Sequence, residues 1–470
     1  MSSSAPRSLS VTLALFAAAS LATTLARPSW RASLRELVYP TRTLVAPRAS
    51  GPLPAQPARV EAAPPVAPPP LPPRWTARSR GDRRVAAIQD PCATSADAGA
   101  CSTRALDGFF ARLTELERGQ RPRVRVTHLG DSIVADDKIT GRMRARLQRE
   151  FGDRGVGWLY AQRPTRWYHP RNVRYEGRGL DTVSVVDEPT VDPPFGPAGA
   201  AFVARAHGAI ASVELTASGT IALYASDATA VSTRVDEGAW QPMASTIRLA
   251  SEGRHRLEMR VDRQGSRLYG LSIERDQPGM IVDNLGLVSS SSRALARQDA
   301  AQWERALAAL SPDLVVISLG TNDSTHGPIP LVHRPALEAS HAALFSLVKR
   351  VAGSCLVLLP PDGAEERGGP LATRASLSAI MEAQRRAATS AGCAMWDTFA
   401  FMGGRNSVLR WHTWGWAEAD HTHLTDGGAA RIADAITDAL LAARDEYLAR
   451  TAPPSNGATE AHPTSADAGR

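Results

Sequence analysis

Short apolar runs alternate with longer amphipathic segments over most of the chain after residue 120, and this alternation constrains the fold more than any other feature. The runs have the length of buried strands, whereas the segments between them repeat their apolar residues with helical spacing. Strands that alternate with helices form a parallel sheet covered by helices. The predicted strands are 124–129, 314–319, 356–359 and 394–397, and the predicted helices are 138–151, 303–310, 336–352, 376–391 and 427–444.

The alternation stops between residues 163 and 280, where short segments of period two are separated by turns that contain glycine and aspartate. Period two with frequent turns indicates an antiparallel β-sandwich. We therefore predict an α/β domain made of residues 86–162 plus 281–450, interrupted by an inserted antiparallel β-sandwich at residues 163–280.

Both ends of the chain differ in composition from these domains. Arg7 precedes an uncharged apolar segment, and residues 1–27 are predicted to be a signal peptide or a membrane anchor. Residues 28–85 are rich in Pro, Ala and Arg, so we expect a disordered, extended linker. Residues 451–470 are rich in Ala, Pro, Ser and Thr and are expected to be a disordered tail.

The charge of the chain gives only a general indication of its partners. The 470 residues have a formal net charge of +7 and a pI near 9.6. Arginine is scattered and no basic run is interleaved with aromatic residues, so nucleic acid is not an expected partner. The positive net charge instead suits contact with an acidic envelope surface or polymer.

The four cysteines are expected to behave in two ways. Cys92 and Cys101 are close enough to close a short loop, which would suit an oxidising compartment. Cys355 and Cys393 lie in apolar strand segments, where buried thiols are the simpler interpretation, although adjacent strands would permit a disulfide. No Cys or His spacing indicates zinc, and we predict neither a metal nor a cofactor.

Three short polar motifs together supply the groups that nucleophilic catalysis needs. Ser132 follows the first apolar run, and its hydroxyl becomes a nucleophile when an imidazole takes its proton, a role that His423 can fill. Asp420, three positions upstream, can hold that imidazole in one tautomer. The Ser132 N–H and the Asn322 side-chain amide can stabilise the oxyanion that forms on an attacked ester.

Each motif also has a purely structural interpretation. Gly-Asp-Ser is a common turn tripeptide, the motif around Asn322 could cap a helix, and Asp420 with His423 could be a solvated pair. The catalytic interpretation is favoured because the motifs follow apolar runs or precede a helix, as active sites of open parallel sheets do.

These motifs resemble the sequence blocks of the GDSL or SGNH hydrolases. Residues 126–132 resemble the first block, 319–323 the third and 420–423 the fifth, while the second block falls at 282–292. The resemblance implies a flavodoxin-like, three-layer fold, in which a backbone N–H of the second block joins the oxyanion hole. Ser289 is the best-aligned position for that donor, and Gly286 lies three residues early.

Residues 128–157 are similar to exported esterases and transferases that handle acetyl groups on cell-wall glycans, such as the peptidoglycan O-acetylesterases. Many of these have His directly after the nucleophile, where this chain has Ile133. In the resembling esterases, a jelly-roll module similar to carbohydrate-binding domains occupies the position of residues 163–280. Glycan binding by the inserted domain is an analogy only.

The sequence thus predicts an exported, periplasmic or envelope-associated serine esterase that removes O-acetyl groups from a cell-envelope polysaccharide, with peptidoglycan as the first guess. An N-terminal membrane association is allowed. The alternatives are an O-acyltransferase with the same triad, a general carboxylesterase or lipase, and a non-catalytic glycan-binding protein. Oligomeric state is not predicted. Further candidates for substrate contact are Asp131, Gly320, Trp411 and Trp414.

Overall fold

The computed structural model describes residues 87–92, 101, 103–186, 194–327 and 329–452, which all belong to one compact unit. The predicted signal or anchor, the predicted linker and all but the first two residues of the predicted tail lie outside the described residues. Among the helices of the described part, none is long and apolar enough to cross a membrane.

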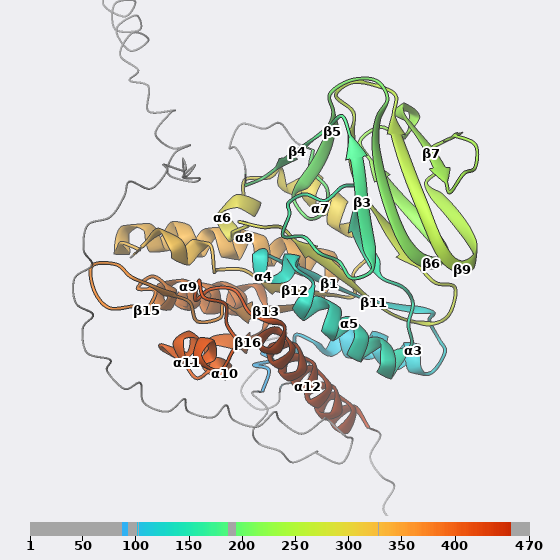
Figure 1. The fold of residues 1–470 in the computed structure, drawn as a ribbon. Helices are drawn as coiled ribbons and strands as arrows, with labels where there is room; N and C mark the ends of the chain where they lie inside the picture. Colours follow the sequence, from blue (N-terminus) through green and yellow to red (C-terminus); the bar gives the residue numbers. More distant parts are fainter. Residues whose placement is uncertain (1–86, 93–100, 102, 187–193, 328, 453–470) are drawn as a thin grey trace, which may run out of the picture. The chain divides into compact units, whose positions relative to one another are not determined.

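A five-stranded parallel sheet forms the centre of the α/β domain (Figure 1). Its spatial order is β11-β1-β12-β13-β16, so the strands in chain order occupy the flavodoxin-like arrangement 2-1-3-4-5. The predicted α/β class is therefore confirmed. The strands are β1 (Arg123–Gly130), β11 (Gly279–Gly286), β12 (Leu314–Ser318), β13 (Cys355–Leu359) and β16 (Ala394–Asp397).

Helices cover both faces of this sheet, because alternate strand residues point to opposite sides. Val124 and Val126 of β1 share a core with α3, α5 and α12, whereas Val315 and Ile317 of β12 share the other core with α7, α8 and α9. The helices are α3 (Asp107–Glu117), α5 (Lys138–Phe151), α7 (Ala300–Ala308), α8 (Arg334–Ala352), α9 (Leu377–Ala391) and α12 (Asp426–Thr451).

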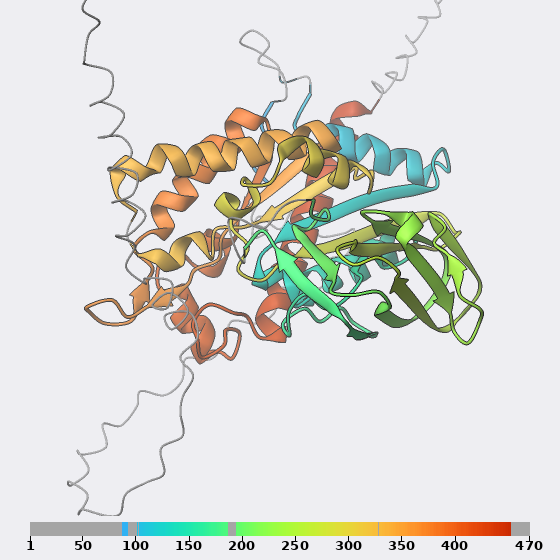
Figure 2. The same ribbon diagram turned by 90° about the horizontal axis from the view of Figure 1, so that it is seen from above.

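The inserted region is a nine-stranded antiparallel sheet beside the α/β layers (Figures 1 and 2). Its order is β4-β5-β10-β6-β9-β7-β8, with β2 also paired to β10 and β3 to β6, so hydrogen bonds join all nine strands in one sheet. The strands are β2 (Gly157–Tyr160), β3 (Val173–Arg178), β4 (Leu180–Ser184), β5 (Ala200–Ala204), β6 (Ala209–Ala225), β7 (Val231–Val235), β8 (Gln241–Pro242), β9 (Thr246–Val261) and β10 (Arg267–Glu274).

The predicted antiparallel insertion is thus present, and two details differ from the sequence pattern. The antiparallel pairing already begins at β2, before the predicted boundary at residue 163. The long strand β6 changes register between Ala217 and Gly219, where Gly219 has a φ of 95° and a Cβ would lie 2.2 Å from the Glu274 carbonyl oxygen. A glycine is required there because no side chain fits.

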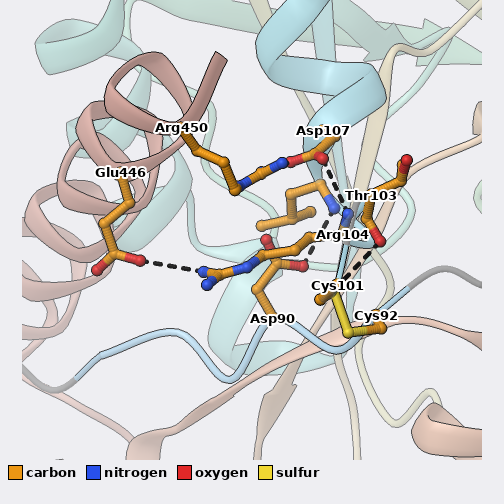
Figure 3. Close-up of a disulfide and its surroundings, with 9 residues drawn as sticks. Asp90, Cys92, Cys101, Thr103, Arg104, Asp107, Glu446 and Arg450 are labelled. Atoms are coloured by element: carbon orange, nitrogen blue, oxygen red, sulfur yellow. Dashed lines mark hydrogen bonds and ion pairs between the residues drawn. A yellow bond between two sulfur atoms is a disulfide. The ribbon is translucent and has the colours of Figure 1, made fainter. Parts of the chain in front are cut away.

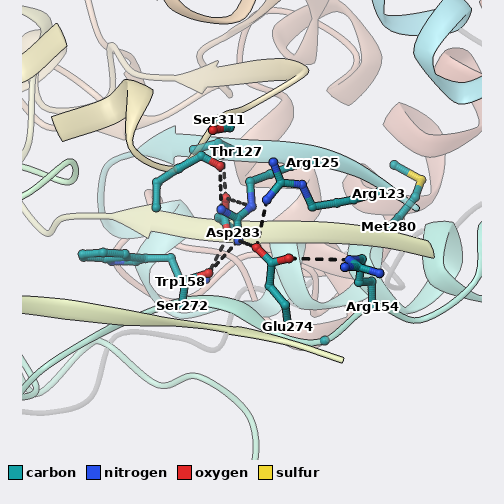
Figure 4. Close-up of polar contacts among 12 residues, drawn as sticks. Arg123, Arg125, Thr127, Arg154, Trp158, Ser272, Glu274, Met280, Asp283 and Ser311 are labelled. Carbon is teal, nitrogen blue, oxygen red and sulfur yellow. Dashed lines mark hydrogen bonds and ion pairs between the residues drawn. The ribbon is translucent and has the colours of Figure 1, made fainter. Parts of the chain in front are cut away.

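Asp283 of β11 forms polar contacts between the two sheets (Figure 4). One carboxylate oxygen accepts from the Thr127 hydroxyl at 2.7 Å and lies 3.4 Å from Nε of Arg125, and the other accepts from the Trp158 N–H of β2 at 2.8 Å. Asp283 is fully buried and Arg125 is 1% exposed. The buried charge pair thus joins β1, the strand that leads to Ser132, to its neighbour β11, and the Asp283 carboxylate connects both to the insert through the Trp158 N–H.

The Arg125 guanidinium extends the same contacts into β10. It donates to the Ser272 hydroxyl and to the Leu310 carbonyl oxygen, both at 2.6 Å, and lies 3.3 Å from Glu274. Glu274 also contacts Arg123 at 2.9 Å. This set of hydrogen bonds offsets the desolvation of the two buried charges.

Two disulfides are present. Cys92 and Cys101 are joined before α3, and the same segment contacts α12 through the ion pair of Arg104 with Glu446 at 3.1 Å (Figure 3). Cys355 and Cys393 are also joined, with Cα atoms 4.9 Å apart. The expectation of two buried thiols is therefore wrong, because the sheet order places β13 directly beside β16.

Candidate active site

The residues of the predicted site meet at the carboxyl ends of β1 and β12. In a 2-1-3-4-5 sheet the chain changes direction between these strands, which opens a crevice at that edge. The close approach of the two strand ends requires Gly130, since a Cβ there would lie 2.8 Å from the Ser318 carbonyl oxygen and 2.3 Å from the Val134 side chain.

Ser132 begins the short helix α4 (Ser132–Ala135) directly after β1. Asp131 caps this helix by accepting the Ile133 N–H at 3.0 Å. Among the described residues, no acceptor is bonded to the Ser132 N–H, so this donor is free for a ligand. Asp131 is 1% exposed, and burial raises the pKa of its carboxyl to about 6. The Asp131 carboxyl is thus enclosed beside the helix that it caps, and its predicted substrate contact stays a prediction.

His423 lies between Ser132 and Asp420. The Ser132 Oγ is 2.9 Å from His423 Nε2, and His423 Nδ1 is 2.6 Å from Asp420 Oδ2. The second oxygen of Asp420 accepts the N–H groups of Thr422 and His423 at 3.0 and 2.9 Å. The three side chains that the sequence singled out as nucleophile, base and orienter are thus in hydrogen-bonding order.

The electrostatic interaction between Asp420 and His423 suits the role of His423 as a base. The hydrogen bond from His423, together with the two backbone N–H groups, holds the pKa of Asp420 well below its usual range. The same hydrogen bond raises the pKa of His423 against the opposing effect of burial. The side chains of His423 and Asp420 are 43% and 50% exposed, so solvent water has access to both.

The Asn322 amide lies beside the turn that follows β11. Its Nδ2 donates one hydrogen to the Ser290 carbonyl oxygen at 2.9 Å, which fixes the amide and leaves its second hydrogen for another acceptor. Ser289 is exposed and has a φ of 64°, in the left-handed region that favours glycine. The Gly286 N–H donates to Asn284 Oδ1 at 2.8 Å at the end of β11, so it is not available to a substrate.

The other predicted substrate contacts have structural explanations. Gly320 is buried with a φ of 117°, and a Cβ there would lie 3.0 Å from Gln384, so packing rather than ligand binding requires the glycine. Trp411 is 3% exposed and its indole N–H donates to the Met402 carbonyl oxygen, so this candidate for substrate contact is packed inside the domain and offers no exposed face. Trp414 is half-buried and packs edge-on against Trp416 at 4.9 Å.

Several residues that support the site were not found from sequence. Asn284 donates to the Val134 carbonyl oxygen at 2.9 Å and so ties α4 to β11. His128 of β1 lies between the hydroxyls of Thr140 and Ser318, both at 2.8 Å, and burial lowers its pKa to about 3. The position of Asn284 within the second block was a signal that could have been used; His128, inside an apolar run, gave none.

Arg374 is the other supporting residue that the sequence did not reveal. It is 8% exposed, and its guanidinium donates to Thr422, which lies between Asp420 and His423. Among the described residues, no group of three or more His, Cys, Asp or Glu side chains is arranged to hold a metal ion.

Comparison with known proteins agrees with this fold. Residues 253–431 match the model of the GDSL-like lipase/acylhydrolase family, a range that includes Asn322, Asp420 and His423 but not Ser132. No curated protein sequence matches the chain.

One solved structure has a similar fold over most of both chains. The structure of a peptidoglycan O-acetylesterase is similar over 72% of this chain and 96% of its own, with a TM-score of 0.60 and 20% sequence identity. A family two carbohydrate esterase from Cellvibrio japonicus aligns over 63% of this chain and 100% of its own, at 11% identity and a TM-score of 0.25. A salicylyl-acyltransferase from a tetracycline biosynthetic pathway aligns over 58% and 98%, at 11% identity and a TM-score of 0.26.

The matched family model and the fold agree with the chemistry of the residues at the switch point. The chain thus resembles the SGNH/GDSL hydrolases, and it is a serine hydrolase that acts on ester bonds.

Proposed function

We propose that this protein removes O-acetyl groups from a cell-envelope polysaccharide, with peptidoglycan as the first substrate to test. The observation behind the proposal is the hydrogen-bonded series Ser132, His423 and Asp420 at the switch point of the sheet. The choice of an acetylated glycan is supported by the fold, which is similar to a peptidoglycan O-acetylesterase over most of both chains.

In the proposed reaction, Ser132 Oγ attacks the acetyl carbonyl carbon while His423 Nε2 takes the hydroxyl proton. Asp420 keeps the imidazole oriented and stabilises its protonated form. The oxyanion accepts hydrogen bonds from the Ser132 and Ser289 N–H groups and from the Asn322 amide. The bond to the sugar oxygen then breaks, His423 protonates that oxygen, and an acetylated Ser132 remains.

Water completes the reaction by attacking the acetyl-enzyme as His423 removes its proton, which releases acetate. The exposure of His423 and Asp420, 43% and 50%, supports hydrolysis because water reaches the base directly. A transferase would instead have to keep water away from the acetyl-enzyme until an acceptor hydroxyl arrives.

We also propose that the protein is exported to the periplasm or the cell envelope. The apolar segment at residues 9–26 supports this location, and so do the two disulfides, which form in oxidising compartments.

The test is acetate release from O-acetylated peptidoglycan by the full chain, with Ser132→Ala and His423→Ala in parallel. Ser251→Ala is the matched control, because Ser251 is an exposed serine of the inserted sheet. We expect acetate from the parent and the control, and a loss of at least about 1,000-fold in the two site variants.

Other outcomes would replace the proposal. Brisk cleavage of long-chain esters without acetate release from the glycan would indicate a lipase. Acetylated glycan formed from an added acetyl donor, with little free acetate, would indicate a transferase. Binding of the glycan that survives in Ser132→Ala, with no turnover of any ester by the parent, would indicate a binding protein.

A further inference from the structure

Arg374 joins the two loops that contain the Asn322 amide and the His423 base. Its Nη1 donates to the Ser324 hydroxyl at 3.2 Å, and its Nη2 donates to the Thr422 hydroxyl at 2.5 Å. Only 8% of the residue is exposed, so the guanidinium lies almost entirely inside the protein.

Ser324 connects Arg374 to the oxyanion side of the site. It lies two residues after Asn322, in the 3-10 turn η2 (Asp323–His326). The Ser324 hydroxyl donates to the Thr321 carbonyl oxygen at 2.6 Å, and its N–H donates to the Gly320 carbonyl oxygen at 3.1 Å. A shift of Ser324 would therefore move the turn that holds the Asn322 amide.

Thr422 connects Arg374 to the base. It is the residue directly before His423, its N–H donates to Asp420 Oδ1 at 3.0 Å, and its hydroxyl donates to the Asp420 carbonyl oxygen at 3.1 Å. Thr422 therefore belongs to the turn that sets the distance between Asp420 and His423.

Arg374 itself is held at the base of the hairpin formed by β14 (Ala364–Glu365) and β15 (Ala372–Thr373). The Arg374 N–H donates to the Gly363 carbonyl oxygen at 2.9 Å, and the Ala364 N–H donates to the His421 carbonyl oxygen at 3.0 Å. The hairpin and the loop of the base thus share a backbone contact in addition to the guanidinium.

The guanidinium is an unusual group for a purely structural bridge. Within the described residues no carboxylate lies within 4 Å of it, and its two side-chain acceptors are neutral hydroxyls. Burial lowers the pKa of Arg374, which the more distant carboxylates of Glu365 and Asp420 oppose. Burying a charge without a direct partner costs stability, so stability alone does not account for an arginine here.

We propose that Arg374 is a positioning residue for the ester hydrolysis, which holds the Asn322 turn and the Asp420–His423 turn at a fixed separation through its two hydrogen bonds. The inference rests on the proposed catalytic roles of those residues. A planar guanidinium can bond two hydroxyls on separate loops at once, whereas the ammonium of lysine is a single point on a flexible stem.

The test compares Arg374→Met and Arg374→Lys with the parent, using a small acetyl ester. Arg367→Met is the matched control, because Arg367 lies in the same hairpin with its side chain 52% exposed. We expect Arg374→Met to lower kcat about 100-fold with KM within twofold, as displacement of catalytic groups by about 1 Å does. Arg374→Lys should lower kcat about tenfold, because one of the two bonds is lost, and Arg367→Met should match the parent.

Two further measurements separate this role from a loss of folding or of substrate. Thermal unfolding identifies a variant that does not fold. If Arg374→Met does not fold, the kcat and labelling rate of Arg374→Lys, which keeps the charge, test the proposal. The rate at which a fluorophosphonate labels Ser132 reports the activated serine even if no acetyl ester is a substrate, and it should fall in both Arg374 variants. A folded Arg374→Met or Arg374→Lys with parental kcat and labelling rate would overturn the proposal, whereas a parent that neither labels nor hydrolyses would overturn the proposed function itself.

Discussion

The Asp283–Arg125 pair gives a sharp test of how the insert is joined to the nucleophile strand. In Asp283→Asn the side chain keeps its shape, and its amide oxygen can still accept the Trp158 N–H, but the negative charge beside Arg125 is lost. Breaking a buried pair by removing one charge costs about 3–5 kcal/mol. We expect about 3 kcal/mol, the lower end, because Glu274 still contacts Arg125 at 3.3 Å.

Asp283→Ala should cost about 1–3 kcal/mol more than Asp283→Asn, because the buried Trp158 N–H then loses its acceptor. The double variant Arg125→Met with Asp283→Asn should recover most of the loss, since a neutral, well-packed pair avoids the desolvation of both charges. The assay is urea unfolding followed by tryptophan fluorescence, evaluated as a double-mutant cycle. Glu176→Gln, which affects an exposed pair with Arg256, is the control and should cost under about 1 kcal/mol. Strictly additive losses in the cycle would refute the reasoning.

Other predictions concern the base, the second disulfide and a buried histidine. The pH profile of kcat/KM should rise through a midpoint above 6.5, since Asp420 raises the pKa of His423 and the base must be neutral; a midpoint below 6.5 would contradict this. Asp420→Asn should lower that midpoint and reduce kcat about 10,000-fold in steady-state assays. Cys355→Ala with Cys393→Ala opens a loop of 38 residues and should cost about 4 kcal/mol in urea unfolding. His128 stays neutral in the folded protein down to about pH 3, whereas the unfolded chain binds a proton below about pH 6.5. The contribution of His128 to stability should therefore fall by about 1.4 kcal/mol for each unit by which the pH is lowered between these values, and His128→Gln should remove this contribution in urea titrations.

The central strands could be predicted from sequence because a buried parallel strand is a continuous apolar run. The predicted strands at 124–129 and 314–319 agree with β1 and β12 to within a residue or two. Strand β11 was not predicted as a strand, because the buried polar residues Asp283 and Asn284 interrupt its apolar run. Their partners come from distant parts of the chain, so no local pattern reveals that they are satisfied.

The site likewise contains residues that the sequence pattern reveals and residues that depend on contacts between distant parts of the chain. Ser132, Asn322, Asp420 and His423 were singled out because their chemistry is complementary and each follows or precedes a recognisable element, and the structure brings them to one edge. Trp411 lies in the short helix α11 (Ser407–Thr413), and its burial depends on how this helix packs, which its sequence neighbours do not determine. Arg374 was missed because one arginine between loops has no periodicity, and its importance lies in contacts that only the folded chain makes.

The insertion also sets the order in which this protein can fold during synthesis. Strand β1 pairs with β11, and Arg123 lies opposite Gly279, which is 156 residues later (279 minus 123). At about 5–20 residues per second, the ribosome needs roughly 8–30 s to supply that partner. The ends of the insert meet where the Met280 N–H donates to the Gly152 carbonyl oxygen at 2.8 Å. An insert that folds early would bring β11 next to β1. An insert that folds slowly would delay the pairing of β1, the nucleophile strand, with β11 and leave the apolar edges of β1 exposed to chaperones and proteases.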